Sequence, residues 1–508
     1  MSVSLHTEDV SFTKMLQRRA SFKRGGTSSS RGVSVEKKGN LQGLLAILKN
    51  PLSILLVFVP AGIGAQHFIG EENSNKAMIV FWLNFVAMVP LANMLGDATE
   101  ELAANLKNDM ISGLLNATFG NAVEIIMSLA FISNYQYDIL KASMVGSMLS
   151  NMLLVLGMSF FFGGLVKQKS MKKGGAKIKA RQVLPTRAAS ETSAAPANGV
   201  GDAERIKRNK SCGTSPCCKR RAHLGDVQVA IHPSQRTLLG EEVGTIENNE
   251  DVGTIQNKEQ HFNVLGALVN NTLLLMASFM LSLVTVFVLY FRQNKAYKNE
   301  YEVQMSRYSS ILIILAYIAY LVFQLFTHQD MLGDAEKGEG AEDDEEEEPG
   351  LSLTASLLLL LAVTMVVAVC SEYLSGSLED ALKSSPIPLT QNFMGVILLP
   401  IIGNACEHVS AIRFAVDERV GLAVGIAVGS SVQIALFAIP FTVLAGWVMH
   451  PGENDLNMDL NFGMLHVVVV FLSVVVVKVV LMDGKANWLE GYLLMTAYLI
   501  SAGLYYFS

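Results

Sequence analysis

Two short acidic motifs stand inside apolar runs of this sequence. Glu124 belongs to the stretch GNAVEI, which begins at Gly120, and Glu407 belongs to GNACEH, which begins at Gly403. A carboxylate at the centre of a lipid bilayer costs about 2.5–3.5 kcal/mol on insertion scales, so it persists there when it meets a cation, a proton or a partner. Two such acids supply two negative charges, which match one divalent cation.

The neighbours of the two acids carry further oxygen atoms. Asn121 and Asn404 each lie three residues before the Glu and therefore share its helical face. Calcium takes six to eight oxygen ligands, and a set of hard oxygens favours Ca²⁺, Mn²⁺ or Mg²⁺ over zinc or copper. The predicted metal ligands are Glu124 and Glu407. The predicted ion- and proton-binding set is Glu124, Glu407, Asn121, Asn404, Ser147, Ser430, Gln433 and His408.

Protons are the expected counter-substrate at such a pair. Desolvation and a nearby like charge both increase the affinity of a carboxylate for protons. Once the cation leaves, Glu124 and Glu407 therefore become protonated, and the site holds either metal or protons. His408, beside Glu407, titrates in the relevant range and has Ile125 at the equivalent position.

The two motifs belong to an internal repeat. Glu407 follows Glu124 by 407 − 124 = 283 residues, and Gly429 of a VGS motif follows Gly146 of another by 429 − 146 = 283. Because both pairs of motifs have the same offset, with no insertion or deletion between them, the two halves indicate a duplicated gene. Each half also has an acidic helix before its GNA motif. In the first half this helix contains TEEL, with Glu100 and Glu101, and in the second half it contains the matching stretch SEYL, with Glu372.

Long apolar runs predict the elements that position these residues. The chain has 508 residues, of which 51% are hydrophobic, and runs of roughly 18–25 apolar residues are typical of membrane-spanning helices. The sequence predicts an all-α integral membrane protein with about eleven spans. They lie near 51–68, 77–105, 111–134, 139–165, 263–291, 308–327, 351–378, 391–415, 420–447, 462–482 and 487–507.

The first span is followed by two halves of five helices each. Because five is odd, the second half inserts upside down, which is the inverted repeat of many secondary transporters, whose site lies at the midplane. The predicted organisation begins with a disordered basic cytosolic tail at 1–40 and a first span at 51–68. The first repeat covers 77–328 and contains a disordered cytosolic loop at 166–262. An acidic linker at 333–350 leads to the second repeat at 351–508.

The distribution of Lys and Arg places the N-terminus, the 166–262 loop and the acidic linker in the cytosol. The basic stretch after the fifth span fits this orientation poorly. The loop lacks the aromatic residues that stack on bases, so no nucleic acid partner is expected. Cys212, Cys217 and Cys218 within it make a weak case for zinc, and no cofactor or cleavable signal peptide is expected.

The motifs together resemble the CAX family of cation/proton exchangers, within the calcium/cation antiporter superfamily. The stretches that carry the resemblance are GLLNATFGNAVEII, GSMLSNMLLVLGMSFFFGG, MSRYSSILIILAYIAYLVFQLFTH, GVILLPIIGNACEH and IAVGSSVQIALFAIP. Two departures are Cys406, where the family has Ala in GNAAEH, and Val123, where it has Thr in GNATE. The 166–262 insertion is also long for the family.

The resemblance implies Ca²⁺ export from the cytosol into an acidic organelle, usually the vacuole, driven by protons, with Mn²⁺ as a further cation. It implies that Glu100, Glu101 and Glu372 lie along the ion pathways, and that the N-terminal tail is regulatory. It also implies a cation-gathering acidic helix. That helix comprises Glu342, Asp343, Asp344, Glu345, Glu346, Glu347 and Glu348.

Two other functions remain open at this point, and a third is disfavoured. One is a Na⁺-coupled or broad-specificity cation exchanger of the same fold, and another is a Ca²⁺-gated channel or sensor. An intramembrane hydrolase is disfavoured because the EH dipeptide lacks the HExxH spacing that puts two imidazoles on one face, so the protein is not expected to be an enzyme. Stoichiometry and oligomeric state are not predicted.

Overall fold

The computed structural model describes residues 40–70, 72–106, 109–167, 259–292, 299–328, 349–452 and 458–508. The predicted tail 1–40 lies outside these residues except for its last position. The bulk of the 166–262 insertion, with its three cysteines, and the acidic run 342–348 also lie outside them. The predictions for these segments therefore stay predictions.

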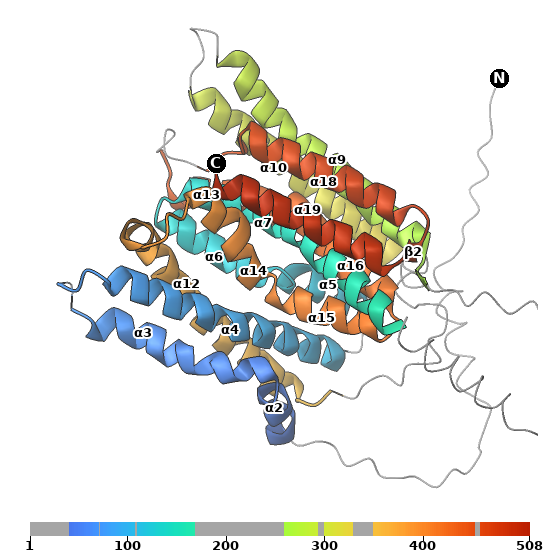
Figure 1. The fold of residues 1–508 in the computed structure, drawn as a ribbon, viewed down its shortest axis with the longest axis horizontal. Coiled ribbons are helices and arrows are strands. Elements are labelled where there is room, and N and C mark those ends of the chain that lie inside the picture. Colours follow the sequence, from blue (N-terminus) through green and yellow to red (C-terminus); the bar gives the residue numbers. More distant parts are fainter. Residues whose placement is uncertain are drawn as a thin grey trace, which may run out of the picture. The chain divides into compact units, whose positions relative to one another are not determined.

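The first half of the described chain is helical almost throughout (Figure 1). Its elements are α2 (Asn40–Leu48), η1 (Pro51–Val57), α3 (Phe58–Phe68), α4 (Lys76–Leu106), α5 (Asp109–Phe119), α6 (Ala122–Ser133), α7 (Tyr137–Leu149), η2 (Ser150–Val155), β1 (Gln260–His261), α9 (Val264–Phe291), α10 (Asn299–Val322) and η4 (Phe323–Thr327). The helix of α7 and η2 continues to Lys167.

The second half repeats this pattern. Its elements are α12 (Leu353–Ser384), α13 (Gln391–Phe393), η5 (Met394–Leu398), α14 (Leu399–Gly403), α15 (Ala405–Val416), α16 (Val420–Gln433), η6 (Ile434–Ala438), α17 (Ile439–Met449), α18 (Met464–Leu481), β2 (Lys485–Ala486) and α19 (Trp488–Tyr506). The segments η2, η4, η5 and η6 are π-helical turns, which are wider than α-helical turns.

Eight helices in the described ranges are long and apolar enough to cross a membrane, and the bent pair 391–403 and 405–416 makes nine. The predicted all-helical membrane fold is therefore confirmed, but its count of eleven is not. Two predicted spans fall short for physical reasons. The segment near 111–134 breaks into α5 and α6, each too short alone, and Glu490 and four tyrosines dilute the apolar character of α19.

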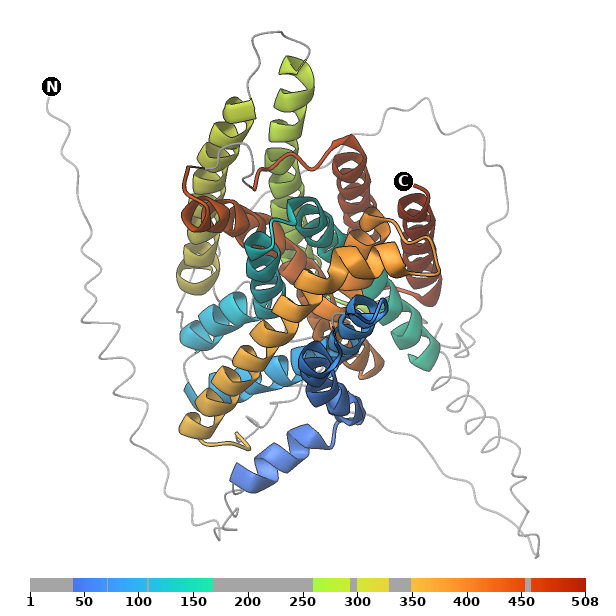
Figure 2. The same cartoon turned by 90° about the vertical axis from the view of Figure 1, so that its left-hand side faces the viewer.

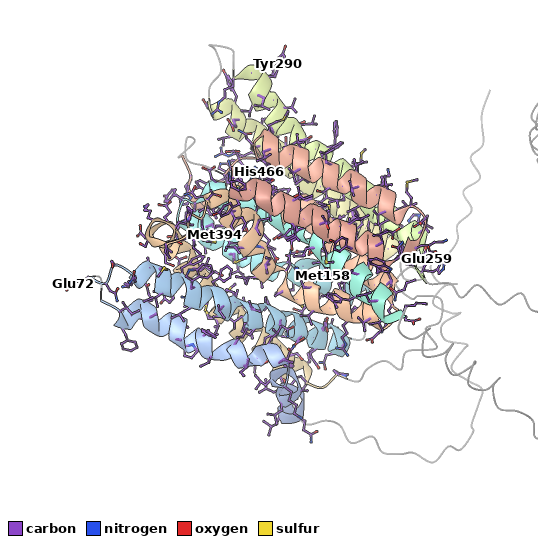
Figure 3. The ribbon with its side chains drawn as sticks, in the orientation of Figure 1. Glu72, Met158, Glu259, Tyr290, Met394 and His466 are labelled. Atoms are coloured by element: carbon purple, nitrogen blue, oxygen red, sulfur yellow. The ribbon has the colours of Figure 1, made fainter. Side chains whose placement is uncertain are left out.

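Contacts between loops define two ends of the bundle, named here the Glu259 end and the Glu72 end after the two residues in Figure 3. At the Glu259 end, Lys167 pairs with Glu418 at 3.2 Å, and β1 pairs with β2 as a two-stranded antiparallel sheet. At the Glu72 end, the Tyr137 hydroxyl lies 3.0 Å from His450 Nδ1.

These ends show that the halves are inverted. The helical run from Tyr137 to Lys167 goes from the Glu72 end to the Glu259 end. Its counterpart, α16 to α17, begins after Glu418 and ends before His450, so it runs the opposite way. Each half therefore crosses the bundle an odd number of times.

The first helices of the repeats, α4 and α12, pack along each other (Figure 2). Asn105 near the end of α4 donates to the carbonyl of Leu351 before α12, at 3.0 Å. Farther along, Ser371 Oγ lies 3.9 Å from Met88 Sδ. Since later residues of α12 meet earlier residues of α4, the two helices run antiparallel, as inverted counterparts must.

The segment before α18 is fastened to the first half by an ion pair. Lys141 of α7 pairs with Asp459 at 3.2 Å and with Asp138 at 3.6 Å. Burial raises the pKa of the Asp459 carboxyl, and the charge of Lys141 opposes that rise. Asn461 of the same segment donates to Glu302 Oε1 at 2.8 Å, which joins the segment to α10 as well.

Replacing Lys141 by Met should destabilise the protein by about 3 kcal/mol near neutral pH, because a largely buried carboxylate loses its cation. The loss of stability should be smaller at acid pH. A raised pKa means that the folded state favours protonated Asp459, so below that pKa little charge remains for Lys141 to offset. The denaturation midpoint across pH measures this. Lys383→Met, which removes only exposed ion pairs with Glu379 and Asp380, should change little at any pH. A pH-independent loss for Lys141→Met would contradict the expectation.

Candidate functional site

Two broken helices bring the acidic motifs into the bundle. The helical path stops at Asn121 between α5 and α6, and at Asn404 between α14 and α15, where the axis bends by 58°. Glu124 and Glu407 are each the third residue of the helix that restarts. A helix N-terminus carries partial positive charge and unpaired N–H groups, so both acids lie where negative charge is favoured.

The two carboxyl groups face the same interior region. Glu124 is 1% exposed and Glu407 is 9% exposed. A Cβ atom built on Gly403, next to the second break, would lie 2.8 Å from Glu124 Oε1. Gly403 lies four residues before Glu407, so the Glu124 carboxyl approaches the segment that carries the other acid. The pair predicted from the repeat is thus brought together by the structure.

A chain of hydrogen bonds joins the halves around the first break. Asn121 donates through Nδ2 to Gln433 Oε1 at 2.7 Å and accepts through Oδ1 from the Ser430 hydroxyl at 2.9 Å. Asn151 donates through Nδ2 to Ser430 Oγ at 3.0 Å. The predicted residues Asn121, Ser430 and Gln433 therefore form one cluster, which also includes Asn151.

The side chains at the second break have a different kind of hydrogen-bond partner. Asn404 donates through Nδ2 to the Ser147 carbonyl at 3.1 Å, so its side-chain oxygen stays without a partner. The ring of His408 donates from Nδ1 to the Asn404 carbonyl at 2.6 Å. His408 thus fixes the backbone at the break, and its Nε2 is buried without a partner.

Five buried side-chain oxygens from these motifs have no hydrogen-bond partner. They are Glu124 Oε1, Glu407 Oε2, Ser147 Oγ, Asn151 Oδ1 and Asn404 Oδ1. Buried polar atoms are normally paired, so an unpartnered set of this size favours a ligand. Carboxylate, amide and hydroxyl oxygens fit a hard cation. Within the described ranges no three His, Cys, Asp or Glu gather as a metal centre, which distinguishes this region from a closed zinc-type site.

Asn151 is the residue of the cluster that the sequence reasoning missed. In the repeat, Asn151 corresponds to the apolar residue Ile434, because 151 + 283 = 434. A search for matched polar pairs therefore passes over Asn151. The stretch GSMLSN, with three polar side chains in an apolar run, is the signal that could have identified it.

The predicted pathway acids lie on α4 and α12. Glu100 is exposed on α4, and Glu372 is exposed on α12, where it accepts a hydrogen bond from Asn134 at 3.3 Å. Because these helices are antiparallel, the two acids lie toward opposite ends of the bundle. Glu101 accepts the backbone N–H of Leu351 at 3.0 Å and so fixes the start of α12.

A further acid, Asp97, lies on α4 beside a close contact with the second motif. Its carboxylate accepts from Asn93 at 2.9 Å. The neighbouring Gly96 packs so closely on Cys406 that an added Cβ would lie 2.5 Å from Sγ. The α4 backbone therefore reaches the residue before Glu407, and the small side chains at this contact permit the approach.

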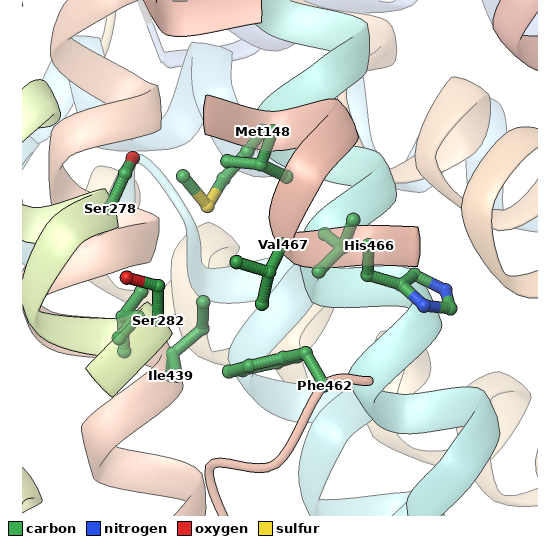
Figure 4. A pocket seen from close by; sticks show the side chains of 10 residues that line it. Met148, Ser278, Ser282, Ile439, Phe462, His466 and Val467 are labelled. Atoms are coloured by element: carbon green, nitrogen blue, oxygen red, sulfur yellow. The ribbon is translucent and has the colours of Figure 1, made fainter. Parts of the chain in front are cut away.

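A separate small pocket lies between α7, α9, α17 and α18 (Figure 4). Its lining is mostly apolar, including Met148, Ile439 and Phe462, with Ser278 and Ser282 on one side. Figure 4 shows the ring of His466 directed away from these serines. The pocket contains neither Glu124 nor Glu407, so it is not the candidate ion site.

An inverted pair of helical repeats with broken helices and facing acids defines an alternating-access membrane transporter. The chain belongs to the sodium/calcium exchanger protein family, whose profile matches residues 76–182 and 355–507. It is similar to vacuolar cation/proton exchanger 2 of Oryza sativa subsp. japonica, with 33% identity over 91% of this chain and 83% of the relative.

Another relative and two solved structures agree with this family assignment. Vacuolar cation/proton exchanger 5 of Arabidopsis thaliana is 32% identical over 91% of this chain and 82% of the relative. The structure of native YfkE has a TM-score of 0.58 and 26% identity, covering 90% of this chain and all of that one. The structure of the H⁺/Ca²⁺ exchanger CAX, at 11% identity and a TM-score of 0.53, covers 90% of this chain and 91% of that one. The similarity to the CAX structure shows that the two proteins share a fold.

Proposed function

We propose that this protein exchanges Ca²⁺ for H⁺ across the vacuolar membrane by alternating access, with Glu124 and Glu407 as the central acids. The observation that carries the proposal is the set of unpartnered buried oxygens from both halves, which includes one oxygen of each acid. The relatives named as vacuolar cation/proton exchangers, and the Ca²⁺/H⁺ antiporter protein YfkE, support the same exchange.

Charge balance explains why the two ions compete. Glu124 and Glu407 together carry two negative charges in a region closed to solvent, and leaving buried charges unpaired is costly. One Ca²⁺ neutralises both, and so do two protons. Because either neutralises the same two carboxylates, the site is charge-balanced with metal or with protons, and this exclusion couples their movements.

The oxygens around the acids supply the rest of the cation's shell. Asn404 Oδ1 and Asn151 Oδ1 are carbonyl-type oxygens without a partner, and Ser147 Oγ is a hydroxyl oxygen of the same kind. Asn121 and Ser430, which bond each other, hold the opposite side of the site in place. The same oxygen set accepts Mn²⁺, which we include as a second transported cation.

The direction of transport follows from the proposed orientation. With the N-terminus in the cytosol, the Glu259 end is cytosolic and the Glu72 end is lumenal. Glu100 then lies on the cytosolic approach and Glu372 on the lumenal approach. The acidic run at 342–348, just before α12, is proposed to gather cations on the cytosolic side.

Reconstituted vesicles with an acid interior provide the test. Ca²⁺ added outside should accumulate inside, and a protonophore that collapses the pH gradient should stop accumulation, because proton exit drives Ca²⁺ entry. Vesicles without protein give the background. Accumulation that follows a Na⁺ gradient instead would support the Na⁺-coupled alternative. Flux that ignores both gradients would support a channel, and either result would overturn the proposal.

A further inference from the structure

The short helix α2 has two different faces. Gly43 and Ile47 are buried against the bundle. On the opposite side Leu41, Leu45 and Leu48 are 69%, 47% and 39% exposed. Their spacing of four and three residues puts all three on one helical face. The helix therefore presents an apolar stripe that no described part of the chain covers.

The direction of α2 places this stripe at the membrane surface. Figure 1 shows α2 at the Glu259 end of α3, lying across the direction in which α3 and α4 run, and Figure 2 shows it lengthwise at the edge of the bundle. A helix transverse to the spans and level with their ends lies in the plane of the interface. There an apolar face enters the boundary between headgroups and acyl chains.

Charge favours an anionic lipid surface as the partner. α2 has no acidic or basic residue of its own, and Lys49 follows it directly. Before it, residues 1–39 hold eight Lys or Arg against three Asp or Glu, a formal charge of 8 − 3 = +5. Basic residues next to an interfacial apolar face are attracted to anionic headgroups.

The buried face of α2 contacts the start of α12. A Cβ built on Gly43 would collide with the Gly350 carbonyl oxygen, so the two backbones touch. The Asn40 side chain accepts the Ser352 N–H at 2.8 Å. Since Glu101 of α4 accepts the adjacent Leu351 N–H, α2 joins the site at which α12 begins and α4 ends.

We propose that α2 is an interfacial helix bound to the anionic leaflet, and that this lipid contact positions the start of α12. The inference concerns a lipid partner and goes beyond ion exchange. A lipid-bound α2 holds Gly350–Ser352, and through them the first helix of the second repeat. Anionic lipid therefore sets how readily α12 and α4 move against each other.

The lipid contact is tested on the full chain carrying Leu45→Trp, in vesicles whose acyl chains are brominated. In vesicles containing phosphatidylserine, bromine should quench the introduced tryptophan roughly twofold more than a tryptophan at the exposed loop residue Asp417 at the same end. The parent protein, with Trp82, Trp447 and Trp488, gives the background. Equal quenching at both positions would overturn the lipid contact. Equal quenching in pure phosphatidylcholine would overturn the anionic preference.

The link to α12 is tested by Gly43→Ala, whose added methyl must push α2 off Gly350. Phosphatidylserine should stimulate Ca²⁺ uptake by the parent about twofold, and Gly43→Ala should lose that stimulation. The control is Gly503→Ala, because nothing lies within 4 Å of a Cβ there. Stimulation that survives in Gly43→Ala would overturn the link. If no variant or parent transports Ca²⁺, the exchange proposal fails, while the quenching result still decides the lipid contact.

Discussion

Replacing Glu407 by Gln should reduce Ca²⁺ accumulation in acid-loaded vesicles by about a hundredfold or more while the protein stays folded. Gln keeps the shape of the side chain but neither carries charge nor takes up a proton, so one transported positive charge loses its partner. Removing one partner of a buried charge costs roughly 3–5 kcal/mol, and each 1.4 kcal/mol is a factor of ten. Glu124→Gln should behave in the same way, because the two acids are related by the repeat.

A matched control separates charge at the site from charge elsewhere. Glu379→Gln removes an exposed carboxylate of α12 that pairs with Lys383 at 3.7 Å, and it should leave uptake within about twofold of the parent, as surface changes usually do. Elution as a single folded species in detergent checks integrity. If both Glu124→Gln and Glu407→Gln retain uptake, the assignment of the site is wrong.

Adding one methyl group at Gly403 should impair transport nearly as much as changing an acid. The Cβ of Gly403→Ala would lie 2.8 Å from Glu124 Oε1, which is too close. The end of a flexible side chain can move away, so we expect the protein to fold with its carboxylate displaced. Misplacing a functional group by about 1 Å can cost roughly a hundredfold in rate.

The repeat supplies the control for this variant. Gly429 belongs to the second motif pair, yet nothing lies within 4 Å of a Cβ built on it. Gly429→Ala should therefore transport Ca²⁺ like the parent. The two alanine variants compared in the same vesicle assay measure the close approach of Gly403 to Glu124. Equal activity of both would show that this contact does not constrain the site.

The fold class could be predicted because membrane helices depend on local sequence. Apolar length identifies the spans without knowledge of their partners, and a constant offset of 283 identifies the duplication. Helix ends are harder to predict. α10 begins at Asn299 rather than near 308, because its first turns are polar yet helical, with Glu300 and Glu302 near the N-terminus, where acids are favourable.

The two central acids of the candidate site could be predicted because they are symmetric. Glu124 and Glu407 repeat in register, so comparing the halves finds both. Asn151 is aligned with Ile434 in that comparison and is missed, although it forms a hydrogen bond with Ser430 of the other half. The hydrogen bond from Leu351 to Glu101 is likewise invisible in sequence, since it joins residues 250 positions apart. Contacts of this kind depend on how helices pack.

The widened helical turns η2 and η6 stand at equivalent places in the two halves. η2 covers 150–155, and adding 283 gives 433–438, which contains η6 at 434–438. π-helical turns are rare and occur frequently at functional sites. Their repetition in register therefore gives each half the same local widening beside the candidate site, since Asn151 lies on η2 and Gln433 directly precedes η6.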